Sequence, residues 1–369
     1  MRRIASHLVM MMLALVMSLA GVFASQSTWD TVESAEIDGV EYVKLSDVWR
    51  SYKCKPCRGL PGYVSYSGSY EGVGYVASLK PGKQDFYVKH ARGARFCRFV
   101  LSHPIRKEGS HLMISSVDLR KLVDPVLHPK FSPNAKLSTV VIDPGHGGHD
   151  AGAVSAIAKE KDLNLAVARK LRSMLKKAGY KVVMTRDGDY FLTLQQRVDI
   201  ANRIPDSIFV SIHHNAGRSA ASGIETFTLA PQGTTSPFAR SRRFAELAGN
   251  NQDSENIALA TAVHSRAITR SGALDRGIQR ARFSVLCTIR RPAILFEGGF
   301  VSNPEECRKM AKGDYQQMLA KCILEGITAY DQTVCTRASV RNMAVTNPGS
   351  ASLRTSMSSS AVRNYSRKK

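Results

Sequence analysis

Four polar residues stand at the carboxyl ends of expected strands or just beyond them, where ligand sites form in open α/β sheets. They are His146, Glu160, His213 and Glu297. Two histidines and one glutamate are the ligand set of some hydrolytic zinc sites, in which a vacant fourth position holds the water to be activated. Zinc lowers the pKa of such a water toward roughly 7, so that hydroxide is available at neutral pH. The residue types therefore indicate metal-assisted hydrolysis.

Glu297 is the candidate for proton transfer. An activated water needs a base to accept its proton and an acid to return that proton to the leaving group. Glu297 ends the apolar run 293–296 and is followed by two glycines. An apolar strand end raises the pKa of a carboxyl group, which suits a group that both accepts and donates. Each of the four residues alone has a simpler structural explanation, so only the set of four favours catalysis.

The elements that would position these residues alternate between strand and helix. Short apolar runs typical of buried strands occur at 139–143, 181–184, 207–212, 223–228 and 293–296. Helices are expected at 160–178, 195–203, 254–270 and 315–330, the first with its apolar residues on one face. This alternation predicts an α/β domain with a mostly parallel sheet flanked by helices.

His146 lies in a glycine-rich turn, Asp143-Pro-Gly-His-Gly-Gly148, directly after the first strand. The glycines let the backbone turn sharply and bring the imidazole inward. The turn lacks the Lys-Ser/Thr ending of a P-loop and the GxGxxG spacing, which disfavours a phosphate-binding loop. Asp143 is expected to orient His146 through its other ring nitrogen, an arrangement common around metal ligands.

Residues 138–330 resemble, block by block and in order, the zinc-dependent N-acetylmuramoyl-L-alanine amidases of the type 3 family. The blocks are 141–153, 160–163, 184–187, 209–213 and 296–303. The resemblance implies zinc ligands His146, Glu160 and His213, with Glu297 as the catalytic carboxylate. It implies hydrolysis of the amide between N-acetylmuramic acid and L-alanine, which releases stem peptides from the glycan strands of peptidoglycan.

Several residues near the expected site have no ligand role in this resemblance. His149 and His214 flank the ligands and fall outside the family's ligand pattern. Glu225 either supports the site from behind or simply ends a strand. Asn303 is expected to cap a helix that starts at Pro304. In some relatives a helix plugs the zinc site, and residues 231–252, with Glu246, are either such a plug or a plain loop.

The first 24 residues have the order of a secretory signal: Arg2-Arg3, an uncharged apolar run over 8–23, and Ala24 before Ser25. An uncleaved anchor is the alternative, because the run approaches the length of a spanning helix. The signal predicts export across the inner membrane, to the periplasm or the cell wall.

Three further segments complete the expected organisation. Residues 35–129 predict a small α+β module, which resembles the copper amine oxidase N-terminal-like domain. A polar segment with prolines separates this module from the catalytic domain, expected over 136–331. Residues 332–369 contain no acidic residue and many serines, which predicts a disordered basic tail.

The composition is strongly basic, with 52 Lys and Arg against 30 Asp and Glu and a formal charge of +22. Such a balance is a footprint of nucleic-acid binding. Export removes the protein from nucleic acid, so no nucleic-acid partner is expected. The predicted partners are peptidoglycan, anionic envelope polymers and a protein activator.

The chain has seven cysteines, an odd number in a compartment that permits disulfides. Cys54-Lys-Pro-Cys57 has the spacing of a redox motif or of half a zinc site, but no second such pair is present. The expectation is therefore a structural bridge, either local or to Cys97.

Three alternatives to the amidase function stay open. A zinc peptidase would cut within the stem peptide, and a catalytically inactive protein would only bind the cell wall. A nucleic-acid binder rests on the charge alone. Product analysis separates the first from an amidase, because an amidase leaves intact stem peptides with free L-alanine amino ends.

Overall fold

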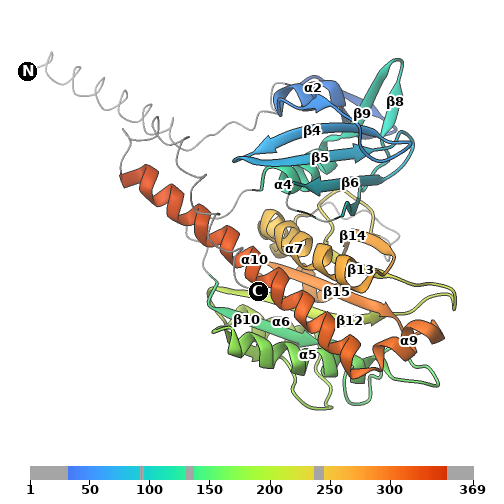
Figure 1. Cartoon of the computed structure of the whole chain (residues 1–369), viewed down its shortest axis with the longest axis vertical. Coiled ribbons are helices and arrows are strands. Elements are labelled where there is room, and N and C mark those ends of the chain that lie inside the picture. The colour runs from blue at the N-terminus through green and yellow to red at the C-terminus, as the bar shows by residue number, and fades with distance from the viewer. Residues whose placement is uncertain (1–31, 92, 94, 130–136, 237–244, 347–369) are drawn as a thin grey trace, which may run out of the picture.

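The strands that carry the expected site come from residues 139–300 (Figure 1). The computed structural model describes residues 32–91, 93, 95–129, 137–236 and 245–346. The predicted signal sequence and residues 347–369 of the predicted tail lie outside these ranges. Among the described helices, none combines the length and the apolar character needed to cross a membrane.

The strands of the catalytic half form a mostly parallel sheet, as predicted. In spatial order they are β11 (Lys181–Met184), β10 (Thr139–Pro144), β12 (Ser207–Asn215), β15 (Ala293–Phe300), β13 (Ile224–Leu229) and β14 (Asp275–Ala281). All neighbours run parallel except β13 and β15, which pair antiparallel. Every residue of β10 and β15 is buried, which explains their continuous apolar runs.

Helices cover both faces of this sheet. The helices α5 (Glu160–Lys177), α7 (Asp253–Ser271) and α10 (Gly313–Thr346) share one core with Val140 and Ile142 of β10. The helices α6 (Leu194–Asn202) and α8 (Ser284–Cys287) share a second core with Val141, on the opposite face. Consecutive residues of β10 thus alternate between the two layers, as strand geometry requires.

Strand β14 was not predicted, because its sequence is polar. It carries Arg276 and Arg280. Arg280 is buried and forms an ion pair with Asp253 at 3.0 Å, and Arg276 forms one with Glu225 at 3.2 Å. The arginine charges that make this segment look exposed in the sequence are therefore neutralised by residues from other elements.

The N-terminal module is α+β, as predicted. Strands β1 (Ser34–Ile37), β2 (Val40–Lys44), β9 (His111–Ser115) and β8 (Arg106–Glu108) form a four-stranded sheet. A second antiparallel set contains β3 (Lys55–Pro56), β4 (Val64–Tyr70), β5 (Val73–Leu79), β6 (Asp85–His90) and β7 (Cys97–Val100). The short helices are α2 (Leu45–Ser51), α3 (Ser116–Asp118), η1 (Leu119–Val123) and α4 (Asp124–Leu127).

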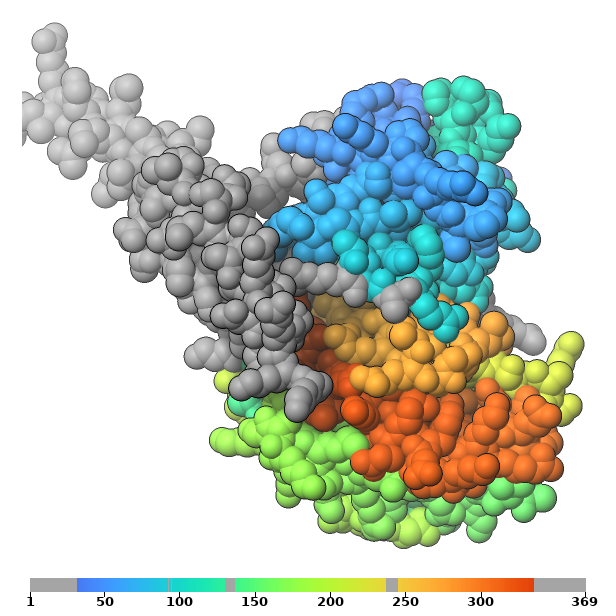
Figure 2. Space-filling model, viewed as in Figure 1, coloured from blue at the N-terminus to red at the C-terminus, as the bar shows by residue number. Residues whose placement is uncertain are grey.

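The module is joined to the catalytic sheet rather than tethered beside it. Strand β7 pairs parallel with β14 through Phe99 and Ile278, which makes one continuous eleven-stranded sheet. One hydrophobic core contains residues of both parts. Figure 2 shows the module, coloured blue to cyan, resting on the orange segment that contains α7.

The prediction of a disordered tail from residue 332 is wrong for its first part. Helix α10 continues to Thr346. Tyr330 and Val334 are buried in the core, which anchors the helix beyond its expected end. The sequence contains neither glycine nor proline between Gly326 and Pro348, so nothing interrupts helix propagation there.

The predicted disulfide at Cys54 and Cys57 is also absent, since both cysteines are free. The two residues between them form strand β3, and extended residues three apart point to opposite faces of a strand. The Cys54 thiol lies 3.3 Å from the Tyr75 hydroxyl instead. Cys97 is free and buried in β7, at the join with the catalytic domain.

Candidate metal centre

The fold brings the four predicted site residues to one edge of the catalytic sheet. His146 follows β10, His213 lies near the end of β12, and Glu297 lies in β15. His213 and Glu297 are register partners on adjacent parallel strands. Glu160 is the first residue of α5. The carboxyl ends of parallel strands therefore meet at the predicted place.

The glycine-rich turn after β10 places His146. His146 has a φ of 61°, in the left-handed region that side chains rarely adopt. Its carbonyl accepts a hydrogen bond of 2.8 Å from Arg197 Nη2, which holds the turn. Gly145 lies beneath the His213 ring, because an added Cβ would stand 2.1 Å from His213 Cε1. Only glycine leaves room for both imidazoles.

Glu160 stands between the two histidines. Its Oε1 lies 3.1 Å from His146 Nε2 and 2.9 Å from His213 Nδ1. The three donor atoms lie within 4.8 Å of one another, and the imidazole rings meet edge to face. Glu160 is buried, whereas the His146 and His213 side chains are 24% and 18% exposed. The cluster is therefore open to solvent from the histidine side.

The charges of this cluster favour an anionic Glu160. Burial alone would raise its pKa, but the hydrogen bonds and charges of His146 and His213 lower that pKa well below its ordinary value. Burial would lower the pKa of His146, yet Glu160 and Asp150 raise it. One carboxylate oxygen and two imidazole nitrogens therefore lie together as possible ligands of a cation.

The partner of His146 is Asp150, and the prediction that Asp143 orients His146 is wrong. Asp150 Oδ2 lies 2.9 Å from His146 Nδ1. The Asp143 carboxylate is buried and accepts hydrogen bonds from Arg197, Thr185 and Ser211. Both of its oxygens accept hydrogen bonds that hold β10 to neighbouring elements. Asp150 lies in the same sequence block, four residues after His146, which is the signal that could have identified it.

Glu297 is buried beside this cluster. Its Oε2 has no hydrogen-bond partner among the described residues. Burial, followed by the negative charges of Glu160 and Glu225, raises the pKa of Glu297 well above its ordinary value. Such a carboxyl group holds a proton more readily than an exposed glutamate does.

Glu225 lies beside Glu297 on the neighbouring strand, which favours the supporting role among the two left open by the sequence. It is buried on β13 and is the register partner of Glu297. Its carboxylate accepts hydrogen bonds from Asn215, Gln279 and Arg276. These contacts fix the carboxylate whose charge acts on Glu297.

Asn164 was missed in the sequence and connects the ligands to the backbone. Its side chain donates to the Gly145 carbonyl at 3.2 Å and to Glu160 Oε1 at 3.5 Å, and its Oδ1 lies 2.7 Å from His214 Nδ1. It lies four residues after Glu160, on the same face of α5. That helical spacing was the available signal.

The two neighbouring histidines lie outside the cluster. His214 is buried and points to the face of β12 opposite His213, as alternation along a strand requires. The His149 ring packs against Phe191, with centroids 4.3 Å apart. Just beyond the carboxyl end of β15, Asn303 caps helix α9 (Pro304–Met310), as predicted.

The segment 231–252 starts at the edge of the sheet remote from the metal cluster. Strand β13 runs antiparallel to β15, so its first residues lie beside Glu297 and its last residues lie beside the start of β15. Glu246 forms an ion pair of 3.3 Å with Lys121 of the N-terminal module. The described parts of the segment, which include the short helix η2 (Ala248–Gln252), therefore contact the module side of the molecule. Residues 237–244 lie outside the described ranges.

The donor set fits a zinc ion. Two imidazole nitrogens and one carboxylate oxygen are the ligands of catalytic zinc sites that keep an open position. Gly152 keeps this space open beside Glu160, because a Cβ added at Gly152 would stand 2.6 Å from Glu160 Oε2. Asp150 holds the second nitrogen of His146, as is usual for a metal-bound histidine.

This chain is similar to several known proteins. The chain is 36% identical over 192 residues to the uncharacterized protein YqiI of Bacillus subtilis, a match that covers 52% of this chain and 84% of that protein. It is 32% identical over 248 residues to the N-acetylmuramoyl-L-alanine amidase AmiA of Escherichia coli, covering 60% of this chain and 86% of that protein.

A solved structure and a protein family also show similarity to this chain. The catalytic domain of the N-acetylmuramoyl-L-alanine amidase CwlV from Bacillus (Paenibacillus) polymyxa is 37% identical, with a TM-score of 0.45. That match covers 53% of this chain and 98% of the other. Residues 140–329 match the N-acetylmuramoyl-L-alanine amidase family. This chain belongs to the N-acetylmuramoyl-L-alanine amidase family, and its predicted site lies within the matched residues.

Proposed function

We propose that this protein hydrolyses the amide between N-acetylmuramic acid and L-alanine of peptidoglycan, with a zinc ion held by His146, Glu160 and His213. The supporting observation is the convergence of three donor atoms within 4.8 Å beside Glu297, whose Oε2 is buried without a partner. Membership of the amidase family supports the substrate class. The reaction releases stem peptides from the glycan strands.

A zinc ion at this centre would polarise the amide carbonyl and lower the pKa of the attacking water. Glu297 accepts the proton of the attacking water and passes it to the amide nitrogen, so the L-alanine end leaves as a neutral amine. The raised pKa of Glu297 supports the step between the two transfers, in which the carboxyl group holds the proton.

The surrounding residues keep the site in one geometry. Asp150 turns the Nε2 atom of His146 toward Glu160, and Asn164 holds the Glu160 carboxylate. Glu225 stays fixed by its own hydrogen bonds and adds negative charge behind Glu297. Glu297 therefore carries the proton from the water to the amide nitrogen, while the other carboxylates stay fixed.

The wider biology follows from the sequence and from the relatives. We place the protein outside the cytoplasm, where peptidoglycan is accessible, and retain the signal at 1–24 as a prediction. The module at 35–129 and the net positive charge are proposed to hold the enzyme on the anionic wall. A protein activator remains a predicted further partner.

Digestion of purified peptidoglycan, with and without a chelator, tests the reaction. The expected products are intact stem peptides with free L-alanine amino ends, and chelation should stop their release. His146→Ala should lose activity and one bound metal, whereas His149→Ala is the matched control and should keep both. Shortened muropeptides with an intact lactyl amide would identify a zinc peptidase instead. Wall binding without any peptide release would identify a binding protein.

A further inference from the structure

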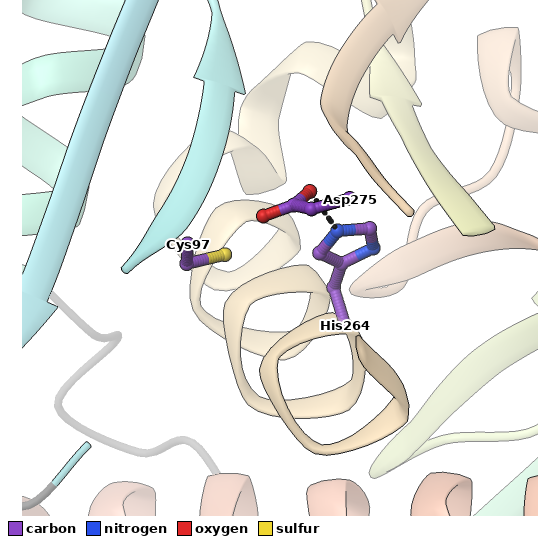
Figure 3. A group of neighbouring side chains, drawn as sticks. All are labelled: Cys97, His264 and Asp275. Atoms are coloured by element: carbon purple, nitrogen blue, oxygen red, sulfur yellow. Dashed lines mark hydrogen bonds and ion pairs between the residues drawn. The ribbon is translucent and has the colours of Figure 1, made fainter. Parts of the chain in front are cut away.

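A second cluster of three metal-binding side chains lies where the N-terminal module joins the catalytic domain (Figure 3). Cys97 comes from β7 of the module, His264 from α7 and Asp275 from the start of β14. One donor atom of each residue lies within 4.8 Å of the other two. Cys97 is buried, and the side chains of His264 and Asp275 are 0% and 12% exposed.

Neighbouring groups hold the outer atoms of this cluster. Thr226 Oγ1 lies 3.0 Å from His264 Nδ1, and the Arg98 backbone N–H donates to Asp275 Oδ2 at 3.0 Å. The inner atoms, His264 Nε2 and Asp275 Oδ1, lie 2.9 Å apart. Figure 3 shows the Cys97 sulfur pointing toward this pair. Hydrogen bonds to the outer nitrogen and oxygen are what orient the ligands of a metal ion.

The chemistry of the three donors selects the class of ion. A thiolate, an imidazole and a carboxylate are all ligands of zinc, and the thiolate disfavours magnesium and calcium. In the absence of a cation, burial and the charge of Asp275 raise the pKa of Cys97 well above its ordinary value, so the thiol is protonated. Zinc binds the thiolate form, so the Cys97 proton passes to solvent when the ion enters.

We propose that Cys97, His264 and Asp275 bind a divalent transition-metal ion of the zinc type. The ion would link the module to the catalytic domain. The strand pairing at this join consists of one register pair, Phe99 with Ile278, so a metal cross-link would strengthen the join beside it. A cavity of about 350 Å³ is lined by Cys97 and by residues of α7 and α10, and it can supply a water as fourth ligand.

Cobalt(II) provides a direct test, because thiolate coordination gives a charge-transfer absorption that histidine and carboxylate ligands do not. The full-length metal-free protein is titrated with cobalt, and zinc content per chain is measured separately. The wild type is expected to bind two metals and to show the thiolate absorption. Cys97→Ser should lose that absorption and one metal, as should His264→Gln.

Two controls separate this site from other metal binding. The double variant Cys54→Ser/Cys57→Ser removes two other thiols of the module and should keep the absorption. His146→Ala should lose the second metal and the hydrolysis while keeping the absorption, so failure of the proposed function is distinguishable from failure of this site. A wild type with no thiolate absorption, or one whose absorption survives Cys97→Ser, would overturn the proposal.

Discussion

Two regions of this protein each bring three metal-binding side chains together, and they differ in access. At the sheet edge, the histidines beside Glu160 are about one-fifth exposed. At the join with the module, His264 is completely buried. A substrate can reach only the first group. Similar donor sets therefore suit different roles, because solvent access decides whether a bound ion can meet a substrate.

The two regions also differ in their neighbouring carboxylates. Beside the open cluster, Glu297 Oε2 has no hydrogen-bond partner among the described residues. In the buried cluster, both oxygens of Asp275 are engaged, by His264 and by the Arg98 backbone. A free carboxylate can carry a proton, whereas an engaged one holds structure. This contrast supports the proposed hydrolysis at the sheet edge.

The largest effect should come from Glu297→Gln, which removes the proton carrier from the open region alone. Hydrolysis of peptidoglycan should fall by about 10²–10⁴-fold, the usual contribution of general acid–base catalysis. Zinc content should stay unchanged. Glu305→Gln, an exposed change on α9, is the control and should retain full activity. Full activity in Glu297→Gln would place the base elsewhere and remove the contrast between the regions.

Asp143→Asn tests whether the acid three residues before His146 is structural. The Asp143 and Arg197 side chains pair at 2.8 Å with 1% and 3% exposure. Breaking a buried pair leaves an uncompensated charge, so the free energy of unfolding should drop by about 3–5 kcal/mol. Chemical denaturation measures this change. The exposed Asp187→Asn should be neutral, and a stable Asp143→Asn would mean that the pair contributes little.

Asp150→Asn should act on the metal and leave folding intact. Loss of the partner that holds His146 Nδ1 should weaken zinc binding by about 10- to 100-fold. Competition with a chelator measures the affinity, and Asp162→Asn on the exposed side of α5 is the control. If Asp143→Asn weakened zinc binding more than Asp150→Asn does, the assignment of the His146 partner would be reversed.

The raised pKa of Glu297 predicts a pH-dependent cost in the metal-free protein. The folded state holds this proton above the pH at which the unfolded chain releases it, so stability falls as the pH rises from the ordinary glutamate pKa toward the folded one. Glu297→Gln should therefore stabilise the metal-free protein at neutral pH by about 1–3 kcal/mol, and by less in acid. Thermal unfolding with a chelator at both pH values measures this. An equal effect at the two would contradict the raised pKa.

The smallest effect is expected at the exposed edge of the module join. The Lys121 and Glu246 side chains are 38% and 50% exposed, and such a pair contributes less than about 1 kcal/mol. Glu246→Gln should leave both the unfolding free energy and the hydrolysis rate nearly unchanged. A faster hydrolysis rate would show that the segment 231–252 restrains the site after all.

Much of the catalytic region was predictable from local patterns. The apolar runs located β10, β11, β12, β13 and β15, and the strand ends located His146, His213 and Glu297. Strand β14 was not predictable, because Arg276 and Arg280 read as exposed until Glu225 and Asp253 are placed beside them. The end of α10 was missed because Tyr330 and Val334 are held by a core that no local pattern reveals.

By itself, the sequence determined the family, the mostly parallel sheet and the four residues at its edge, because strand periodicity and the glycine-rich turn are local properties. Only the tertiary structure decided that Asp150 rather than Asp143 serves His146, that β7 extends the catalytic sheet, and that Cys97 meets His264 and Asp275. Cys97 is separated from Asp275 by more than half of the described chain. Contacts over such separations depend on how whole helices and strands pack, and local sequence patterns do not predict that packing.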